Sequence, residues 1–263
     1  MADLFFPQLR TGAIAHYPIR KTAATRTVLN VLPGASVLMY PDDAARKAVW
    51  SWEYAGLTME EAATLQNFFV ACTGPLKPFT FLDPTGNLLS ASSDFTAPAW
   101  QASSGLRATG GFRGPVSDVA ATTLVNDSQA AEEIGQTLNI PSNFSYCFSL
   151  YLSSPTLSSV TLFRRSAYSE DTVSVPIGSD WKRVWASGNL HDQSTGLSVG
   201  IRLAPGQQVT ASAAQLEAQP GISGYLDRPQ AGDIYPNAHW AIDEFSIQYL
   251  GPSNCGVSVA IES

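Results

Sequence analysis

The chain has 263 residues and a formal net charge of −7; 44% of its residues are hydrophobic and only 14% are charged. This length suits two domains, and this composition excludes a largely disordered chain. Lys and Arg never occur in runs longer than a pair, and no apolar stretch approaches the roughly 20 residues of a membrane-spanning helix. We therefore expect no nucleic-acid partner and no membrane insertion. The start, Met1–Pro7, lacks the basic and apolar regions of a signal peptide.

The first 86 residues predict several strands. Segments at 26–32 and 36–40 flank the turn signal Pro33-Gly34, and residues 48–55 alternate large and small side chains. A short aromatic strand at 78–84 ends with Asp-Pro. These segments together predict a sheet.

One helix is predicted, and it begins after Thr58. Thr58-Met59-Glu60-Glu61 forms a capping box, in which the Thr58 hydroxyl accepts the amide of Glu61 and the Glu61 carboxylate reaches back. Gly74-Pro75 supplies the stop. Apolar residues recur between them at helical spacing, at Ala62, Leu65, Phe68, Phe69 and Cys72. We expect this apolar face to lie on the sheet.

Residues 87–229 have a different character, because they are rich in Ser, Thr, Ala and Gly. Short strands separated by turn-rich stretches predict a β-sandwich or jelly roll. These strands are expected at 146–152, 159–164, 181–187, 197–203 and 208–216. The closing segment, 230–263, carries one hairpin pattern, with strands at 244–250 and 256–261.

The first segment resembles the N-terminal domain of phage distal tail proteins. The resemblance is carried by Phe6-Pro7-Gln8-Leu9, by the Trp-containing strand at 46–54, by the helix ending in Phe68-Phe69, and by the Phe-x-Phe-x-Asp-Pro pattern within 74–84. Proteins of this family pack as rings at the tail tip. The resemblance therefore implies a ring-forming homo-oligomer, hexameric as in the family, with tail-tube and hub or baseplate proteins as partners.

The middle segment resembles carbohydrate-binding modules of the galactose-binding-like jelly-roll type. Asn87-Leu88-Leu89, followed by Asp94-Phe95 and Trp100, is similar to the opening strand of those modules. Asp180–Val184 is similar to their central Trp-x-Arg-Val strand, and Ala214–Glu217 followed by Tyr225-Leu226 to their closing segment. The resemblance concerns the fold, which hosts many functions, and implies little about the ligand.

These patterns predict a mainly β protein. An N-terminal β-sandwich or barrel domain with one α-helix is expected from residues 1–86 and 230–263, with a jelly-roll β-sandwich inserted at 87–229. The closing hairpin would complete the first domain, because a lone hairpin is not independently stable. The expected role is structural, in the virion tail tip after assembly in the host cytoplasm, with an insert that binds cell-surface polysaccharide. The alternative is an insert that serves only as a protein-contact or spacer module.

Sugar binding needs an exposed aromatic face and a few polar side chains. Tyr168, in a polar loop, is the best exposed candidate. Trp181 and Trp185 share one face of a strand, and packing in the core is the favoured interpretation for both. Arg164 and Arg202 could supply hydrogen-bond donors, or could lie on a solvated strand face.

A structural calcium ion is the one cofactor that the fold resemblance suggests. Asp94 and Asp227 lie near the two ends of the insert and could meet there, although two carboxylates without a dense ligand pattern are weak evidence. The cysteines, Cys72, Cys147 and Cys255, form no CxxC pair and predict buried thiols in a protein made in a reducing compartment.

Catalysis has little support in the sequence, and we expect no enzymatic activity. The histidines fall in no metal motif, and neither a nucleophile elbow nor a P-loop occurs. Glu132-Glu133 and Glu170-Asp171 are interpreted as solvated surface, because a glycosidase needs two carboxylates that face each other across a cleft. A glycan-degrading enzyme is the least favoured of the three interpretations.

Overall fold

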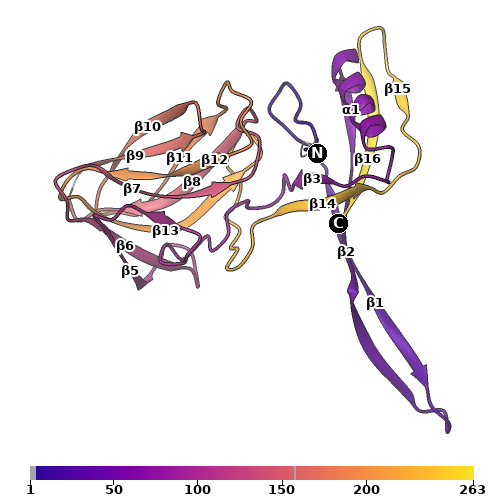
Figure 1. Ribbon diagram of the computed structural model, residues 1–263, viewed down its shortest axis with the longest axis horizontal. Coiled ribbons are helices and arrows are strands. Elements are labelled where there is room, and N and C mark those ends of the chain that lie inside the picture. Colours follow the sequence, from indigo (N-terminus) through magenta and orange to yellow (C-terminus); the bar gives the residue numbers. More distant parts are fainter. Residues whose placement is uncertain (1–3, 157) are drawn as a thin grey trace. The chain divides into compact units, whose positions relative to one another are not determined.

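The computed structural model describes residues 4–156 and 158–263, without the side chains of residues 43–46. Residues 1–3 and the Arg46 side chain, which the sequence analysis used, lie outside this part. The chain forms two compact units (Figure 1). The first comprises the residues up to Arg10, Ile14–Phe81 and Tyr235–Ser263, and the second comprises Thr11–Ala13 and Leu82–Ile234. Both are built mainly of strands, which confirms the predicted fold class.

The first unit is built on a six-stranded sheet. Its order is β1 (Arg20–Val31), β2 (Val37–Leu57), β16 (Cys255–Glu262), β14 (Ile234–Trp240) and β3 (Phe79–Leu82), with β15 (Ile247–Tyr249) also paired with β16. The predicted closing hairpin is confirmed as β15 and β16. The sequence pattern did not predict β14.

Strand β2 is longer than the sequence indicated. The predicted strands at 36–40 and 48–55 belong to one element, which pairs with β1 over its first part and with β16 from Val49 onward. Pro41 does not interrupt β2. Among the described strands, this part of β2 pairs with β1 only, so it is an edge strand, and proline is tolerated in edge strands.

One helix, α1 (Met59–Ala71), occurs among the described residues. The capping box is confirmed, since the Thr58 hydroxyl accepts the amide of Glu61 at 3.2 Å and the Glu61 carboxylate accepts the amide of Thr58 at 3.0 Å. Ala62 and Leu65 are buried, so the predicted face is the one that packs. No helix in the described part of the chain is long and apolar enough to cross a membrane.

An aromatic cluster around Phe6 forms the core of the first unit. The Phe6 ring centroid lies 5.6–6.0 Å from the centroids of Trp52, Phe68, Phe79, Phe81 and Trp240. Trp50, Trp52 and Trp240 are buried in the single chain. These tryptophans therefore stabilise the fold of the single chain.

The second unit is a sandwich of two five-stranded antiparallel sheets. The β9 sheet has the order β10 (Glu170–Ile177), β9 (Ser158–Arg165), β12 (Leu197–Leu203), β7 (Glu132–Leu138) and β4 (Gln101–Ala102). The β8 sheet has the order β11 (Lys182–Gly188), β8 (Tyr146–Ser153), β13 (Gln208–Glu217), β6 (Ala120–Asn126) and β5 (Leu106–Arg113). The sequence predicted β8, β9, β11, β12 and β13 but not the other five strands.

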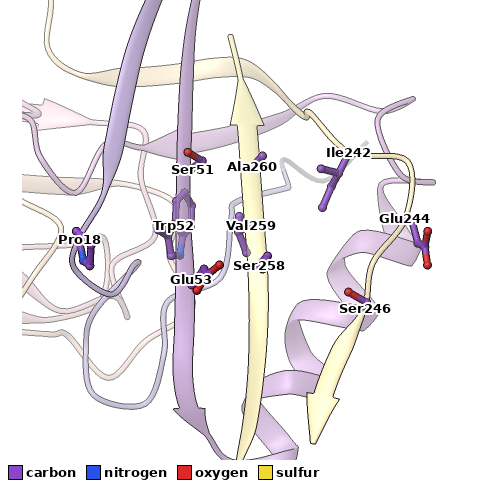
Figure 2. Close-up of a pocket in the computed structure, with 10 residues that line it drawn as sticks. All are labelled: Pro18, Ser51, Trp52, Glu53, Ile242, Glu244, Ser246, Ser258, Val259 and Ala260. Carbon is purple, nitrogen blue, oxygen red and sulfur yellow. The ribbon is translucent and has the colours of Figure 1, made fainter. Parts of the chain in front are cut away.

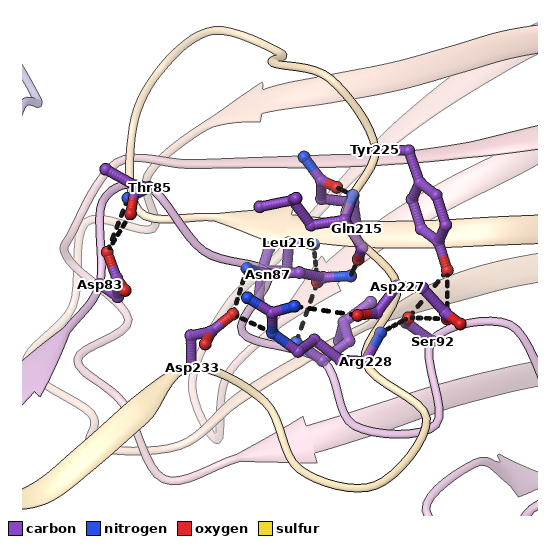
Figure 3. Close-up of polar contacts among 12 residues, drawn as sticks. Asp83, Thr85, Asn87, Ser92, Gln215, Leu216, Tyr225, Asp227, Arg228 and Asp233 are labelled. Carbon is purple, nitrogen blue, oxygen red and sulfur yellow. Dashed lines mark hydrogen bonds and ion pairs between the residues drawn. The ribbon is translucent and has the colours of Figure 1, made fainter. Parts of the chain in front are cut away.

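The two ends of the second unit are fastened together by buried polar side chains (Figure 3). The Asn87 side-chain amide donates to the carbonyls of Ala214 and Leu226, both at 3.0 Å, and its oxygen accepts the amides of Leu89 and Leu216. Asp233 accepts the Asn87 amide at 2.9 Å. These bonds join the first residues of the unit to β13 and to the segment that leaves the unit. Asn87 is fully buried, and its side chain has hydrogen-bond partners as a buried polar group requires.

Candidate functional site

The outward face of the β9 sheet is shaped by one phenylalanine and two glycines. Phe163, Gly200 and Gly135 occupy directly paired positions on β9, β12 and β7. A Cβ on Gly200 would lie 2.7 Å from Phe163 Cζ, and a Cβ on Gly135 would lie 3.0 Å from it. The Phe163 ring therefore lies across both glycines, against the sheet, and is only 4% exposed.

Four charged side chains, which we call the charge quartet, bind one another on the same sheet: Arg165, Arg202, Glu133 and Glu170. Arg165 Nη2 donates to both Glu133 oxygens at 2.8 Å, and Arg202 Nε donates to Glu133 Oε1 at 2.7 Å. The same two arginines bind Glu170, Arg202 through Nη2 at 2.8 Å and Arg165 through Nε. The Arg165 guanidinium carbon lies 4.8 Å from the Phe163 ring centroid. Each arginine binds both glutamates. Two positive and two negative side chains give the quartet no formal net charge.

The hydrogen bonds within the quartet favour the charged forms of Glu170, Arg165 and Arg202. Burial opposes the charge of Glu170, but hydrogen bonds from Arg202 and Arg165 outweigh it and hold the pKa of this carboxyl below its ordinary value. Hydrogen bonds to Glu170 and Glu133 raise the pKa of Arg202. Burial works against the charge of Arg165, yet its bonds to the same glutamates raise its pKa as well. These three groups are therefore charged at neutral pH.

A depression of about 270 Å³ lies beside the quartet, and Gly135 and Phe163 contribute to its lining. Its polar lining consists of Gln101, Ser103, Glu133, Thr137, Arg165 and Ser198. The hydroxyl oxygens of Thr137 and Ser198 are hydrogen-bonded at 2.7 Å. Glu133 is the one carboxylate in this lining and is already bound by two arginines. Glycoside hydrolysis needs two opposed carboxylates, so the depression suits binding better than hydrolysis.

Tyr168 lies at the tip of the turn between β9 and β10 and is 82% exposed. The Ser166 hydroxyl accepts the amides of Tyr168 and Ser169, both at 3.0 Å. The Asp192 carboxylate accepts the hydroxyls of Ser142 and Ser166, each at 2.6 Å, and of Ser169. These hydroxyls hold the pKa of Asp192 well below its ordinary range. The turn is thus fixed from several sides and presents the phenol ring to solvent.

Trp185 lies on the outward face of the β8 sheet and is 52% exposed. The interpretation of Trp185 as a core residue is therefore wrong, because Val184 and Ala186 take the inward positions of β11. Trp181 precedes β11 and is half-buried. Trp185, Tyr168 and the depression lie on the β8 sheet, on a turn and on the β9 sheet respectively, so the predicted aromatics do not form one site.

Arg164 faces the interior of the sandwich and is 3% exposed. Its guanidinium is bound by Asp171 and donates to the carbonyl of Tyr146 at 3.4 Å. This placement argues against Arg164 as a sugar contact. The next residue, Arg165, points outward instead, because successive side chains of a strand alternate between its faces. The sequence analysis did not consider Arg165 as a binding residue. It interpreted Glu133 and Glu170 as members of solvated acid pairs.

Asp94 and Asp227 each bind groups close to them. Asp94 accepts the amide and the hydroxyl of Thr96 at 2.9 and 2.6 Å. Asp227 accepts the hydroxyls of Tyr225 and Ser92 at 2.9 and 3.3 Å (Figure 3). Among the described residues no group of three or more His, Cys, Asp or Glu side chains could hold a metal ion. The calcium site stays a prediction.

The first unit has a hollow of about 480 Å³ over β2 and β16 (Figure 2). Ser51 and Glu53 of β2 and Ser258 of β16 line it, together with Ile242 and Glu244 from the segment between β14 and β15. No His, Cys, Lys or Arg belongs to this lining. The hollow therefore offers hydroxyls and carboxylates but no cationic or thiol group for catalysis.

The far part of the β1–β2 hairpin, residues 20–47, forms an arm that extends away from α1 and the other strands of the first unit (Figure 1). Every residue of β1 is exposed. Residues 27–40 include no charged side chain. Within residues 27–40 both faces of the arm are mainly apolar, with Leu29 opposite Met39 and Val31 opposite Val37 on one face, and with Val28 opposite Tyr40 and Asn30 opposite Leu38 on the other.

No protein-family model and no curated protein sequence matches this chain. Solved structures that are similar include a bacteriophage CBA120 tailspike protein 4 enzymatically active domain, with 13% identity and a TM-score of 0.43 over 52% of this chain and 22% of that one. The CBM22-1 xylan-binding domain of Paenibacillus barcinonensis Xyn10C has 12% identity and a TM-score of 0.43 over 52% of this chain and 96% of its own. TmCBM61, solved with β-1,4-galactotriose, has 16% identity and a TM-score of 0.37 over 49% and 97%. Similarity at this level says nothing about a ligand of this chain.

Proposed function

We propose that this chain is a non-enzymatic structural subunit of a phage-type tail tip, that it assembles into a ring of identical copies, and that its second unit binds cell-surface glycan. Its partners would be other copies of itself, tail-tube proteins, and hub or baseplate proteins. The observation that carries the structural part is the arm, which has no covering within the described part of the chain.

The arm supports self-assembly because it is unstable as an isolated element. A two-stranded ribbon is marginal in water, and exposed strand edges are templates for pairing with another chain. Natural edge strands are usually protected by charges or bulges. The arm has a register shift between Ala24 and Arg26 and an ion pair between Arg26 and Asp42, but residues 27–40, beyond both, carry no charge. The ribbon has one free edge along β1 and another along the first part of β2, so the edge of one copy can meet the opposite edge of the next. Head-to-tail contacts of this kind form a ring when the rotation from one copy to the next closes.

The glycan-binding part is supported by two aromatic side chains on rigid supports. Tyr168 projects from a turn fixed by Asp192, and Trp185 projects from the middle of β11. Exposed aromatic rings on ordered backbone suit contact with the apolar faces of sugars, because little side-chain entropy is lost on binding. A spacer role for the second unit is the alternative, and it would leave both rings without a ligand.

Measurement of the solution mass, together with electron microscopy of the purified full chain, tests the structural proposal. We expect a closed ring with peripheral globular units. A strictly monomeric mass at high concentration would refute it. Binding of immobilised bacterial-surface and plant polysaccharides by the full chain tests the second part, with Tyr168→Ala and Trp185→Ala as variants. Absence of binding to every polysaccharide would favour the spacer role.

A further inference from the structure

We propose that the depression beside the charge quartet is a binding site for an uncharged sugar unit of a polysaccharide, and that it discriminates against acidic sugars. This inference rests on the proposed glycan binding of the second unit. It names a site distinct from Tyr168 and Trp185, and a class of ligand.

The charge balance of the quartet disfavours an anionic ligand. A ligand carboxylate gains most from a guanidinium that has no other anionic partner. Arg165 and Arg202 are each bound to both Glu133 and Glu170, so neither offers an unpaired charge. A second carboxylate placed in the depression would also lie beside Glu133. It would have to displace a partner from an arginine, which cancels the gain.

The remaining lining matches the hydroxyl groups of a neutral sugar. The Thr137–Ser198 pair uses one hydroxyl hydrogen internally, which leaves the second hydrogen and several lone pairs for a ligand. Gln101 and Arg165 also line the depression, and both carry N–H donors. The lining thus offers donors and acceptors together, and a sugar hydroxyl is both.

The size and surroundings of the depression suit a short stretch of chain. Its volume of about 270 Å³ lies just below the roughly 300–1,000 Å³ of pockets for drug-sized ligands. It reaches β4, a two-residue strand at the edge of the β9 sheet, so a polymer can continue past this edge. Phe163 is almost fully covered, and recognition here therefore depends on hydrogen bonds rather than on stacking.

The test is isothermal titration of the full chain with soluble neutral polysaccharides (xylan, galactan and a β-glucan) and with polygalacturonate as the acidic probe. Thr137→Val and Ser198→Val remove one hydroxyl each while leaving the quartet in place. Thr172→Val is the matched control, because Thr172 is paired with Phe163 on the same sheet but lies outside the lining. We expect a neutral polysaccharide to bind, each lining variant to weaken it by about tenfold, and the control to bind as the parent does. Added salt should change this affinity little, since no net charge is involved.

Preferential, salt-sensitive binding of polygalacturonate would overturn the proposal. Neutral binding that survives both lining substitutions but is lost in Trp185→Ala or Tyr168→Ala would overturn this site and leave the glycan-binding function standing. Absence of binding to every neutral probe would refute this site, and absence of binding to the bacterial-surface polysaccharides as well would refute the glycan-binding function itself. Unfolding midpoints of all variants show whether a loss of binding reflects a loss of fold.

Discussion

The arm gives the most direct test of self-assembly. Leu29 is 58% exposed and Met39, opposite it, is 69% exposed. Full burial of such a side chain is worth about 1.5–3 kcal/mol, so covering the exposed fractions stabilises an interface by about 1–2 kcal/mol each. The double variant Leu29→Lys, Met39→Glu removes about 2–4 kcal/mol per interface, which weakens association by about 30- to 1,000-fold. The new charges are opposite each other across the ribbon, so the hairpin itself is not destabilised.

Sedimentation velocity over a range of concentrations measures this effect, and thermal unfolding reports on the fold of the subunit. We expect the double variant to be monomeric where the parent chain is a ring, with an unfolding free energy that changes by less than about 0.5 kcal/mol. Leu76→Lys is the control, because Leu76 is 72% exposed and lies outside the arm. If the double variant assembles as the parent does, the arm is not the interface and the reasoning from its exposed apolar faces is wrong.

Three further predictions concern stability and are checked by urea unfolding of the full chain. Asn87→Ala leaves buried backbone groups without a hydrogen-bond partner and should lower the unfolding free energy of the second unit by about 3 kcal/mol; an unchanged midpoint would mean that Asn87 is dispensable. Thr58→Ala should cost about 1 kcal/mol by removing the helix cap, whereas the exposed mid-helix control Thr64→Ala should cost less. The folded-state pKa of Glu170 lies below its unfolded value, so its contribution is complete above its ordinary pKa of about 4.3 and is lost as the pH falls below that value. The stability difference between the parent chain and Arg202→Met should therefore shrink towards acid pH, and a difference that grows there would contradict the assignment.

The helix could be derived from the sequence because all its signals are local. The cap at Thr58, the apolar spacing and the stop at Gly74 lie within one short segment, and each acts on neighbouring residues. Strands such as β8 and β12 were equally visible, because aromatic residues mark β8 and β-branched residues mark β12. Strands β7 and β10 were not predicted, because each begins with a pair of acidic residues. In the sequence alone, where the arginines that bind them cannot be seen, such pairs are typical of solvated loops.

The orientation of single side chains depended on where the core lies. Alternation placed Trp181 and Trp185 on one face of the strand predicted at 181–187, but only the packing of Val184 and Ala186 shows that the other face is buried. The hairpin around Pro33-Gly34 was predicted from two strand segments that flank a turn signal. The same sequence pattern occurs whether the strands are covered by other parts of the protein or exposed. That the arm extends away from the rest of the first unit is a property of the tertiary structure.

The sequence by itself determined the mainly β class, the one helix and the positions of half the sandwich strands, because these depend on interactions between near neighbours in the chain. Only the tertiary structure brought together the charge quartet, whose members come from β7, β9, β10 and β12 and of which Arg202 and Glu133 are 69 residues apart. Strand order and register set such contacts, and both follow from the packing of the whole sandwich rather than from any one segment.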